Sequence, residues 1–333
     1  MREGKIDAGS AHQSPRQRES TRRRVRLPAD IRIICVAVAI FLALSFASPR
    51  FLTTGNIYNL LDQSVVVGIA AIGQTFVILV AGIDLSVGAV TGLAGILFGL
   101  SMTRLGLPLY VAMPGVVVAG ALLGFLNGML VNFGRIAPFI VTLGTMSICR
   151  SAAYLVSDGN SISNLPDDLS MLSIADIAGV PFNFLFLLAL FALAWWYLQR
   201  TKGGRTIYAI GSNRDAAVAA GLRTTRYANV AYAVSGASAG LAAVFLGSRL
   251  MSIDPLAGNG LELDAIAAVV IGGASLFGGR GSMLGSLFGV FIMVLIRNGL
   301  NLLGVGPYWQ GTAIGTIILV AVLIERMTSG SKH

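Results

Sequence analysis

The chain has 333 residues, of which 55% are hydrophobic and 12% are charged, and its mean hydropathy is +0.78. Soluble domains carry about 25% charged residues, so this composition excludes an ordinary soluble protein and indicates an all-α polytopic membrane protein. The net charge of +9 does not indicate a nucleic-acid partner, because eight of the 24 Lys and Arg residues fall in the first 26 positions and six in segment 200–226. Orientation signals of membrane proteins are distributed in this way.

The first 30 residues are polar and Arg-rich and predict a disordered cytoplasmic tail. A transmembrane domain at 31–326 and a short cytoplasmic tail at 327–333 follow. About 20 apolar residues cross the hydrocarbon core of a bilayer. The apolar runs therefore predict about ten membrane spans, at 31–48, 63–81, 85–102, 109–131, 137–156, 181–199, 227–247, 262–277, 282–303 and 308–325.

Charge predicts the orientation of these spans. Segment 200–226 carries six basic residues against one acid, Asp215, whereas segment 157–180 carries four Asp residues and no Lys or Arg. By the positive-inside rule the first segment is cytoplasmic and the second lies outside. Ten spans then leave both termini in the cytoplasm. The span 262–277 and the connection 82–86 fit least well, which indicates broken or re-entrant helices.

The sequence also contains a weak internal repeat. Three positions recur at one spacing: Asn132, Pro138 and Phe139 match Asn301, Pro307 and Tyr308. The predicted topology puts the two junctions on opposite sides of the membrane. We interpret this as the sign of an inverted internal repeat, a common device in transporters.

Polar residues within the apolar sequence are candidates for a transport path. Asp84 and Ser86 lie in the motif Gly82–Gly88, between two spans with almost no room for a loop. An ionisable group at membrane depth needs a partner, water or a cavity. Both residues can instead cap the following helix, and that interpretation stays open. The full candidate path comprises Asp84, Ser86, Arg150, Asn259, Glu262, Asp264, Asn301 and Gln310, although each can also serve helix packing.

Segment 200–226 predicts a short helix with both ends marked in the sequence. Asn213 is a favourable N-cap, residues 214–220 are mostly strong helix formers, and Gly221 fits the position after the helix. A capped, Ala-faced helix in a cytoplasmic loop offers a docking surface to a soluble partner. The alternative is a basic loop that only fixes topology.

Signatures of an enzyme are missing from the sequence. His12 and His333 are terminal, so no His-based triad or His metal site is expected. The letters of segment 236–240 match a nucleophile elbow, but they lie in an apolar helix and predict helix packing. Cys35 and Cys149 lie in apolar spans. No phosphate-binding loop occurs, so ATP would have to bind another chain. We expect no cofactor and no metal.

Four motifs in order make the chain resemble the permease subunits of bacterial ABC importers for monosaccharides of the ribose, xylose and galactose type. They are GIDLSVG at 82–88, APFIVTLGTMSICR at 137–150, TKGGRTIYAIGSNRDAAVAAGL at 201–222 and VVIGGASLFGGRGS at 269–282. The resemblance covers residues from about 30 to 325. The longer, Arg-rich N-terminal tail and Ser151, where a Gly is expected, depart from the family pattern.

The resemblance implies a permease of the bacterial inner membrane that moves a monosaccharide into the cytoplasm by alternating access. ATP hydrolysis would be carried by a separate subunit, a periplasmic binding protein would deliver the sugar, and two permease copies would pair, as a homodimer. The loop at 201–222 would dock onto the ATPase. The coupling residues carried over are Arg205, Tyr208, Gly211, Asn213, Asp215, Ala216, Ala217 and Gly221.

Two alternatives stay open. A branched-chain amino-acid permease of the same superfamily is the nearest, although it would be expected to lack GIDLSVG. An ion-coupled secondary transporter would account for Asp84, Glu262 and Asp264 but leaves the capped helix unexplained. The sequence does not name the sugar, because selectivity in such importers is expected to lie in the binding protein.

Overall fold

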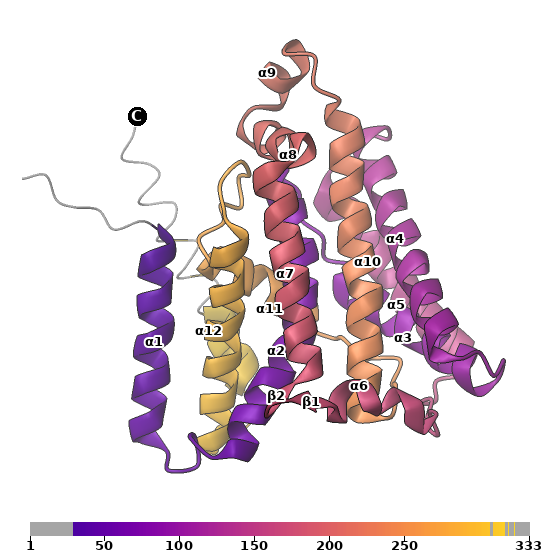
Figure 1. Ribbon diagram of the computed structural model, residues 1–333. Coiled ribbons are helices and arrows are strands. Elements are labelled where there is room, and N and C mark those ends of the chain that lie inside the picture. Colours follow the sequence, from indigo (N-terminus) through magenta and orange to yellow (C-terminus); the bar gives the residue numbers. More distant parts are fainter. Residues whose placement is uncertain (1–28, 307–308, 317–318, 320–322, 324–333) are drawn as a thin grey trace, which may run out of the picture.

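The computed structural model describes residues 29–306, 309–316, 319 and 323, and within these residues the protein is a bundle of helices (Figure 1). The predicted all-α membrane fold is confirmed. The long helices are α1 (Ala29–Ala47), α2 (Thr54–Leu79), α3 (Val87–Thr103), α4 (Leu109–Asn132), α5 (Pro138–Ser157), α7 (Phe182–Arg200), α10 (Thr224–Leu250) and α12 (Met283–Leu302). The short ones are α6 (Met171–Ile174), α8 (Lys202–Ser212), α9 (Arg214–Ala219) and α11 (Leu261–Ile271), and residues 309–316 are also helical.

Six of the described helices, α2, α4, α5, α7, α10 and α12, are long and apolar enough to cross a membrane, and Ile31–Ala47 and Val87–Thr103 form shorter apolar helices. The span predicted at 262–277 is wrong in extent. Its helix α11 has 11 residues, and at 1.5 Å per residue it is about 16 Å long, half the hydrocarbon thickness. Much of the span predicted at 308–325, and all but the last two residues of the predicted tail 1–30, lie outside the described residues.

Helix α2 begins nine residues before the predicted span at 63–81, because the stretch from Thr54 to Asp62, which mixes polar and apolar residues, continues the helix beyond the apolar run. The segment 157–180, which was expected to lie outside, has structure of its own. It contains the 3₁₀ helix Asp167–Leu169, helix α6 and a small antiparallel hairpin of β1 (Asp176–Ile177) and β2 (Val180–Pro181).

Two broken helical segments run in opposite directions through the bundle. After α2 the chain turns back, and α3 starts at Val87 and runs parallel to α10, with Thr91 Oγ1 within 3.2 Å of the Ala239 carbonyl oxygen. After α10 the segment 251–260 turns back, and α11 runs antiparallel to α12. The first turns of α3 and α11 therefore meet inside the bundle, as expected for broken helices at 82–86 and 262–277. The opposed directions agree with the inverted repeat, although Pro307 and Tyr308, two of the repeated positions, lie outside the described residues.

Glycine lets these segments approach closely. A Cβ atom at Gly88 would overlap the Glu262 carboxylate and the Gly258 carbonyl oxygen, and one at Gly92 would lie 2.8 Å from the Ala257 carbonyl oxygen. In the 236–240 segment, a Cβ at Gly236 would overlap the carbonyl oxygen of Gly120 on α4. The predicted packing role of that segment is confirmed.

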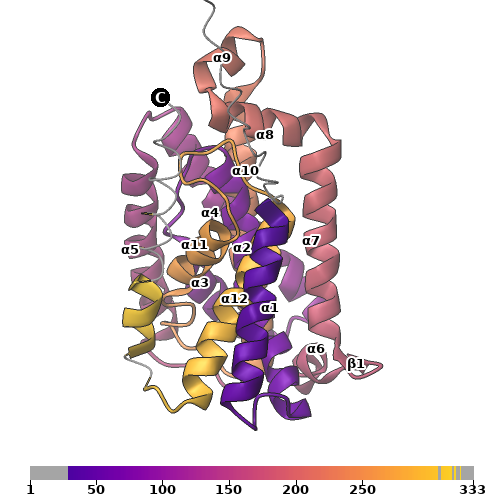
Figure 2. The same ribbon diagram turned by 90° about the vertical axis from the view of Figure 1, so that its left-hand side faces the viewer.

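The two ends of the bundle differ. Helices α8 and α9 lie at one end, and α6 with β1 and β2 lies at the other (Figure 1). The view in Figure 2 shows α8 lying across the end of the bundle, with α9 beyond it. We call this the α8–α9 end. Helix α1 also begins there, because Ile33 lies beside Gly273 and Gly279 packs against Ser212.

Candidate functional site

The α8–α9 end consists of one anchored helix and one projecting helix. Thr201 caps α8 by accepting from the Gly204 backbone N–H at 3.1 Å. The Tyr208 hydroxyl donates to the Gly281 carbonyl at 3.0 Å. Gly211 is packed too tightly for a Cβ, against the Leu79 carbonyl oxygen. Tyr208 and Gly211 thus attach α8 to the bundle, whereas the Arg205 side chain is exposed.

Sequence reasoning missed α8. Its signal was present in the buried positions 203, 206, 207 and 210, which recur at helical spacing behind a threonine cap. The two adjacent glycines at 203 and 204 obscured it, because glycine disfavours helix interiors.

Helix α9 has the predicted ends. The Asn213 side chain accepts from the Ala216 backbone N–H at 2.9 Å, and Gly221 has φ +76° in the left-handed region. Arg214 Nη2 donates to Asn132 Oδ1 at 2.7 Å and ties α9 to the end of α4. Asp215 and Ala216 are exposed.

Within α9, one of the predicted coupling residues faces inward. Ala217 is only 4% exposed and packs inward, whereas its neighbour Val218 is 56% exposed. The apolar surface that α9 presents is therefore formed by Ala216, Val218 and the residues that follow, ending at the exposed Leu222.

A second group of polar residues lies in the interior, and we call it the polar junction: Asp84, Ser86, Asn127, Thr145 and Ser235. Asp84 is 1% exposed, and its two carboxylate oxygens accept from the Ser86 hydroxyl at 2.6 Å and the Ser235 hydroxyl at 2.7 Å. Asn127 donates to Ser86 Oγ at 3.0 Å and accepts from Thr145 at 2.6 Å. The junction thus links α4, α5, α10 and the segment before α3.

This geometry corrects the capping interpretation of Asp84 and Ser86. Ser86 occupies the N-cap position of α3 but makes no side-chain capping bond, and Asp84 bonds to the backbone N–H of Ser86 at 3.0 Å. Asp84 therefore holds segments together across the bundle and does not satisfy the first turn of α3. Asn127 and Thr145 were missed; an amide and a hydroxyl inside apolar helices were the only signal.

The acids of α11 face different surroundings. Glu262 Oε2 is buried without a hydrogen-bond partner among the described residues, against Gly88 in the first turn of α3. Asp264 is 5% exposed and accepts from Arg297 Nη2 at 2.7 Å. Both acids lie in the first turn of a helix, where the backbone dipole favours a negative charge.

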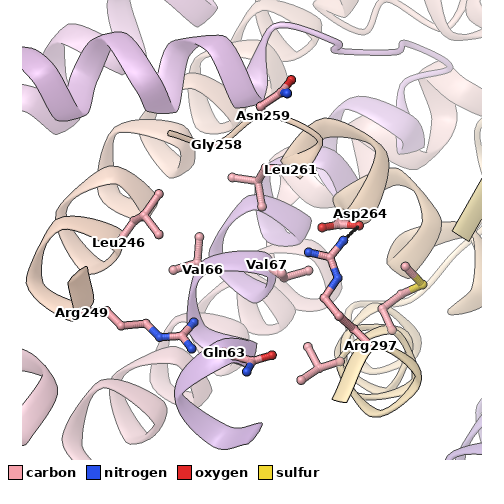
Figure 3. Close-up of a pocket in the computed structure, with 12 residues that line it drawn as sticks. Gln63, Val66, Val67, Leu246, Arg249, Gly258, Asn259, Leu261, Asp264 and Arg297 are labelled. Atoms are coloured by element: carbon pink, nitrogen blue, oxygen red, sulfur yellow. Dashed lines mark hydrogen bonds and ion pairs between the residues drawn. The ribbon is translucent and has the colours of Figure 1, made fainter. Parts of the chain in front are cut away.

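A polar cavity of about 190 Å³ lies between α2, α10, α11 and α12 (Figure 3). Figure 3 shows Arg249 and Gln63 on one side and the Asp264–Arg297 pair on the other, with Val66 and Val67 between them. Asn259 lies at a further edge, where Arg150 donates to it at 3.0 Å. The lining residues are Gln63, Val66, Val67, Leu246, Arg249, Gly258, Asn259, Leu261, Asp264, Met293, Val294 and Arg297.

The predicted path residues therefore fall into separate places. Asp84 and Ser86 belong to the polar junction, and Asn259 and Asp264 line the cavity. Asn301 accepts from Gln310 at 2.7 Å in a third place, at the end of α12. Gln63, Arg249 and Arg297 were not predicted. In the described part of the chain no cluster of His, Cys, Asp and Glu is arranged to hold a metal ion.

Comparison with known proteins identifies the family. Residues 56–323 match the family described as branched-chain amino acid transport system / permease component. The chain is 40% identical to the ribose import permease protein of Haemophilus influenzae, covering 89% of this chain and 93% of that protein. It is 40% identical to the D-allose transport system permease protein of Escherichia coli, covering 89% and 90% of the two chains.

The fructose import permease protein of Rhizobium meliloti is 37% identical, covering 90% of this chain and 85% of that protein. No solved structure matches. The predicted similarity to sugar import permeases is confirmed. The chain belongs to the family of ABC importer permeases, as a multi-pass inner-membrane transport component and not an enzyme.

Proposed function

We propose that the protein is the membrane subunit of an ABC importer that moves a neutral monosaccharide, a ribose-like pentose or a hexose, from the periplasm to the cytoplasm. The observation that carries this proposal is the similarity, over most of both chains, to permeases named for ribose, allose and fructose. The polar cavity supports it, because its amide side chains and ion-paired groups can form hydrogen bonds with an uncharged, hydroxyl-rich solute.

The energy source in this proposal is ATP hydrolysed by a separate chain, and the α8–α9 end is the coupling surface. Helix α9 projects beyond the bundle and presents Val218 and Leu222, which suit a groove on a partner protein. Tyr208 and Gly211 fasten α8 to the bundle near the end of α2. A displacement of α9 would thereby be passed to the bundle.

Transport would proceed by alternating access, in which the cavity is open to one side of the membrane at a time. A periplasmic binding protein would deliver the sugar at the end opposite α8 and α9, and a second copy of the chain would complete the assembly as a homodimer. The basic residues of segment 200–226 favour a cytoplasmic α8–α9 end, with both termini on that side and the tails 1–30 and 327–333 in the cytoplasm.

Substrate class is tested by uptake into vesicles that contain the permease, its ATPase and its binding protein. We expect at least one of labelled D-ribose, D-allose and D-fructose to accumulate, and labelled L-leucine not to. The leucine arm is included because the family description names branched-chain amino acids. Accumulation of leucine and none of the sugars would contradict the proposal.

Orientation is tested by labelling single cysteines in a background without Cys35 and Cys149. Ser163 and Ser212 are both exposed and lie toward opposite ends of the bundle. We expect a membrane-impermeant reagent added to intact spheroplasts to label Ser163→Cys but not Ser212→Cys. Labelling of both from the periplasm would overturn the orientation.

A further inference from the structure

The polar cavity lies in the half of the bundle remote from α8 and α9. Arg249 is in the last turn of α10, whose first residue follows α9, and Gln63 is in the early part of α2, whose last residue lies under α8. In the proposed orientation this half is periplasmic. The volume of about 190 Å³ is below the roughly 300–1,000 Å³ typical of drug-sized ligands, so the cavity suits a small solute.

The charged groups of the cavity are paired within the protein. Arg249 Nε lies 2.7 Å from Asp62 Oδ2, and Arg297 Nη2 lies 2.7 Å from Asp264 Oδ1. Each guanidinium is thus balanced by a carboxylate. An anionic solute would find no unpaired cation among these residues, whereas a neutral solute would not need one.

Several polar atoms of the lining remain unused by the described residues. Gln63 donates its amide to Asn59 at 3.1 Å, and its carbonyl oxygen accepts from none of the described groups. Asn259 accepts from Arg150 through its oxygen, and its amide nitrogen donates to none of the described groups. The bond between Asp264 and Arg297 involves one of the two carboxylate oxygens and one of the three guanidinium nitrogens.

The cavity therefore combines unused acceptors, on Gln63 and Asp264, with unused donors, on Asn259 and Arg297. Its remaining walls are aliphatic, from valine, leucine and methionine side chains. A sugar hydroxyl both donates and accepts hydrogen bonds, and the C–H groups of the ring pack on aliphatic surface. The ion pairs also fix the arginines, so their remaining N–H groups are held in place.

We propose that this cavity, within a single permease chain, binds the monosaccharide after its release from the binding protein. Gln63, Asn259, Asp264 and Arg297 bond its hydroxyl groups. Arg249 acts as a positioning residue. Its Nη2 donates to Asn59 Oδ1 at 3.0 Å, and the Gln63 amide bonds to the same oxygen. This inference rests on the proposed function and adds to it the place and the chemistry of binding: neutral sugars are accepted, and sugar phosphates and sugar acids are rejected.

The first test introduces a thiol into the cavity wall. Val67→Cys is made in a Cys35→Ser, Cys149→Ala background, and Leu105→Cys is the matched control because Leu105 is 72% exposed, just after α3, outside the cavity. The assembled transporter is treated with a charged, membrane-impermeant methanethiosulfonate, and labelling is verified by mass spectrometry. We expect labelled Val67→Cys to lose the uptake that it has before labelling, and labelled Leu105→Cys to keep it.

Protection makes the test specific for the ligand. The transported sugar, at saturating concentration with the binding protein present, should slow the labelling of Val67→Cys, and the corresponding sugar phosphate should not. If Val67→Cys does not reach the membrane, Met293→Cys, in the part of the cavity wall that α12 contributes, takes its place. Unchanged uptake by fully labelled protein would overturn the inference.

The second test removes a hydrogen-bonding group without adding a reagent. Gln63→Leu should lower the maximal rate of uptake by up to about tenfold, the effect expected for one neutral hydrogen bond, while binding-protein-stimulated ATP hydrolysis continues. Equal losses of uptake and of stimulated hydrolysis would assign Gln63 to assembly and count against the inference. If unmodified protein takes up no monosaccharide, the proposed function itself fails. If the unmodified protein takes up a monosaccharide and these variants take it up equally well, only the cavity assignment fails.

Discussion

Helix α9 and the polar junction are stabilised by contacts of very different range. Asn213 bonds to the backbone three residues ahead and Gly221 ends the same helix, so both ends of α9 are decided within one short stretch. Asp84 instead accepts from Ser235, which is 151 residues away in sequence. The first region could be predicted from the residues in it, whereas the second exists only once four separate segments have packed.

The two regions also differ in how they face their surroundings. At the α8–α9 end, apolar side chains such as Val218 are exposed, and few bonds join α9 to the bundle. At the polar junction a carboxylate is enclosed and each of its oxygens is bonded. Substitutions in the first region should affect partner recognition, and substitutions in the second should affect assembly of the bundle. The following predictions test this contrast, starting with the largest effect.

The largest effect is expected where α4 and α10 meet near the polar junction. Gly236→Leu would drive a side chain into the Gly120 backbone, so we expect no assembled protein in the membrane. Gly115→Leu is the matched control, since no atom of the described residues lies within 4 Å of the position that its Cβ would take. Membrane yield and size-exclusion profile measure both. Normal assembly of Gly236→Leu would contradict the close approach of these helices.

The next effect concerns the Asp84 carboxylate. Asp84→Ala leaves the Ser86 and Ser235 hydroxyls buried without their acceptor, at about 1–3 kcal/mol for each buried group left unsatisfied. We expect a lower melting temperature and a lower membrane yield. Asp84→Asn keeps one oxygen for Ser86, and the Ser235 hydroxyl can rotate to accept from the amide, so substantial assembly and uptake should persist.

If Asp84→Asn assembles normally and transports nothing, the charge itself is required for transport. That outcome would assign the polar junction a part in the transport cycle and would contradict its purely structural role.

A substitution on α9 should separate coupling from assembly. Val218→Asp puts a charge on the exposed apolar surface, and we expect uptake and binding-protein-stimulated ATP hydrolysis to be lost while membrane yield is unchanged. Val218→Ala, which keeps the surface apolar, should retain most activity. Ala217→Asp should instead lower the yield, because Ala217 is buried. Full coupling in Val218→Asp would remove α9 from the contact.

The smallest effect is expected at the α9 cap. Asn213→Ala removes the acceptor for the Ala216 N–H, which costs about 1 kcal/mol of helix stability. We expect a partial loss of ATPase stimulation without a change in the melting temperature of the bundle. Asn213→Ser, which keeps a capping oxygen, should behave like the unmodified protein. A drop in melting temperature would mean that α9 is coupled to the core more strongly than its contacts indicate.

The contrast also explains how much could be predicted from the sequence. Hydropathy predicted the long helices, and the residues at its two ends, Asn213 and Gly221, predicted α9, because both signals are local. The extent of α11 was wrong, because residues 272–277 carry no charge and include Leu276 and Phe277, so they read as a continuation of the span. In the structure, glycines with φ near +85°, at Gly273 and Gly278, turn the chain there. Ala217 was assigned to the surface because composition alone does not say which side of a six-residue helix packs inward.

The cavity could be predicted only in part. Asn259 and Asp264 stood out as polar residues near membrane ends, but their partners Gln63, Arg249 and Arg297 lie on other helices. A pairing such as Asp264 with Arg297 depends on how α11 and α12 pack. The sequence contains no local pattern that indicates it.

ATP-driven sugar uptake tests the central claim most directly. Vesicles containing the permease and its ATPase, with ATP on the side of α8 and α9 and sugar-loaded binding protein on the other, should accumulate labelled monosaccharide. The same vesicles given an ion gradient without ATP should not. Accumulation driven by an ion gradient alone, with the ATPase omitted, would contradict the account.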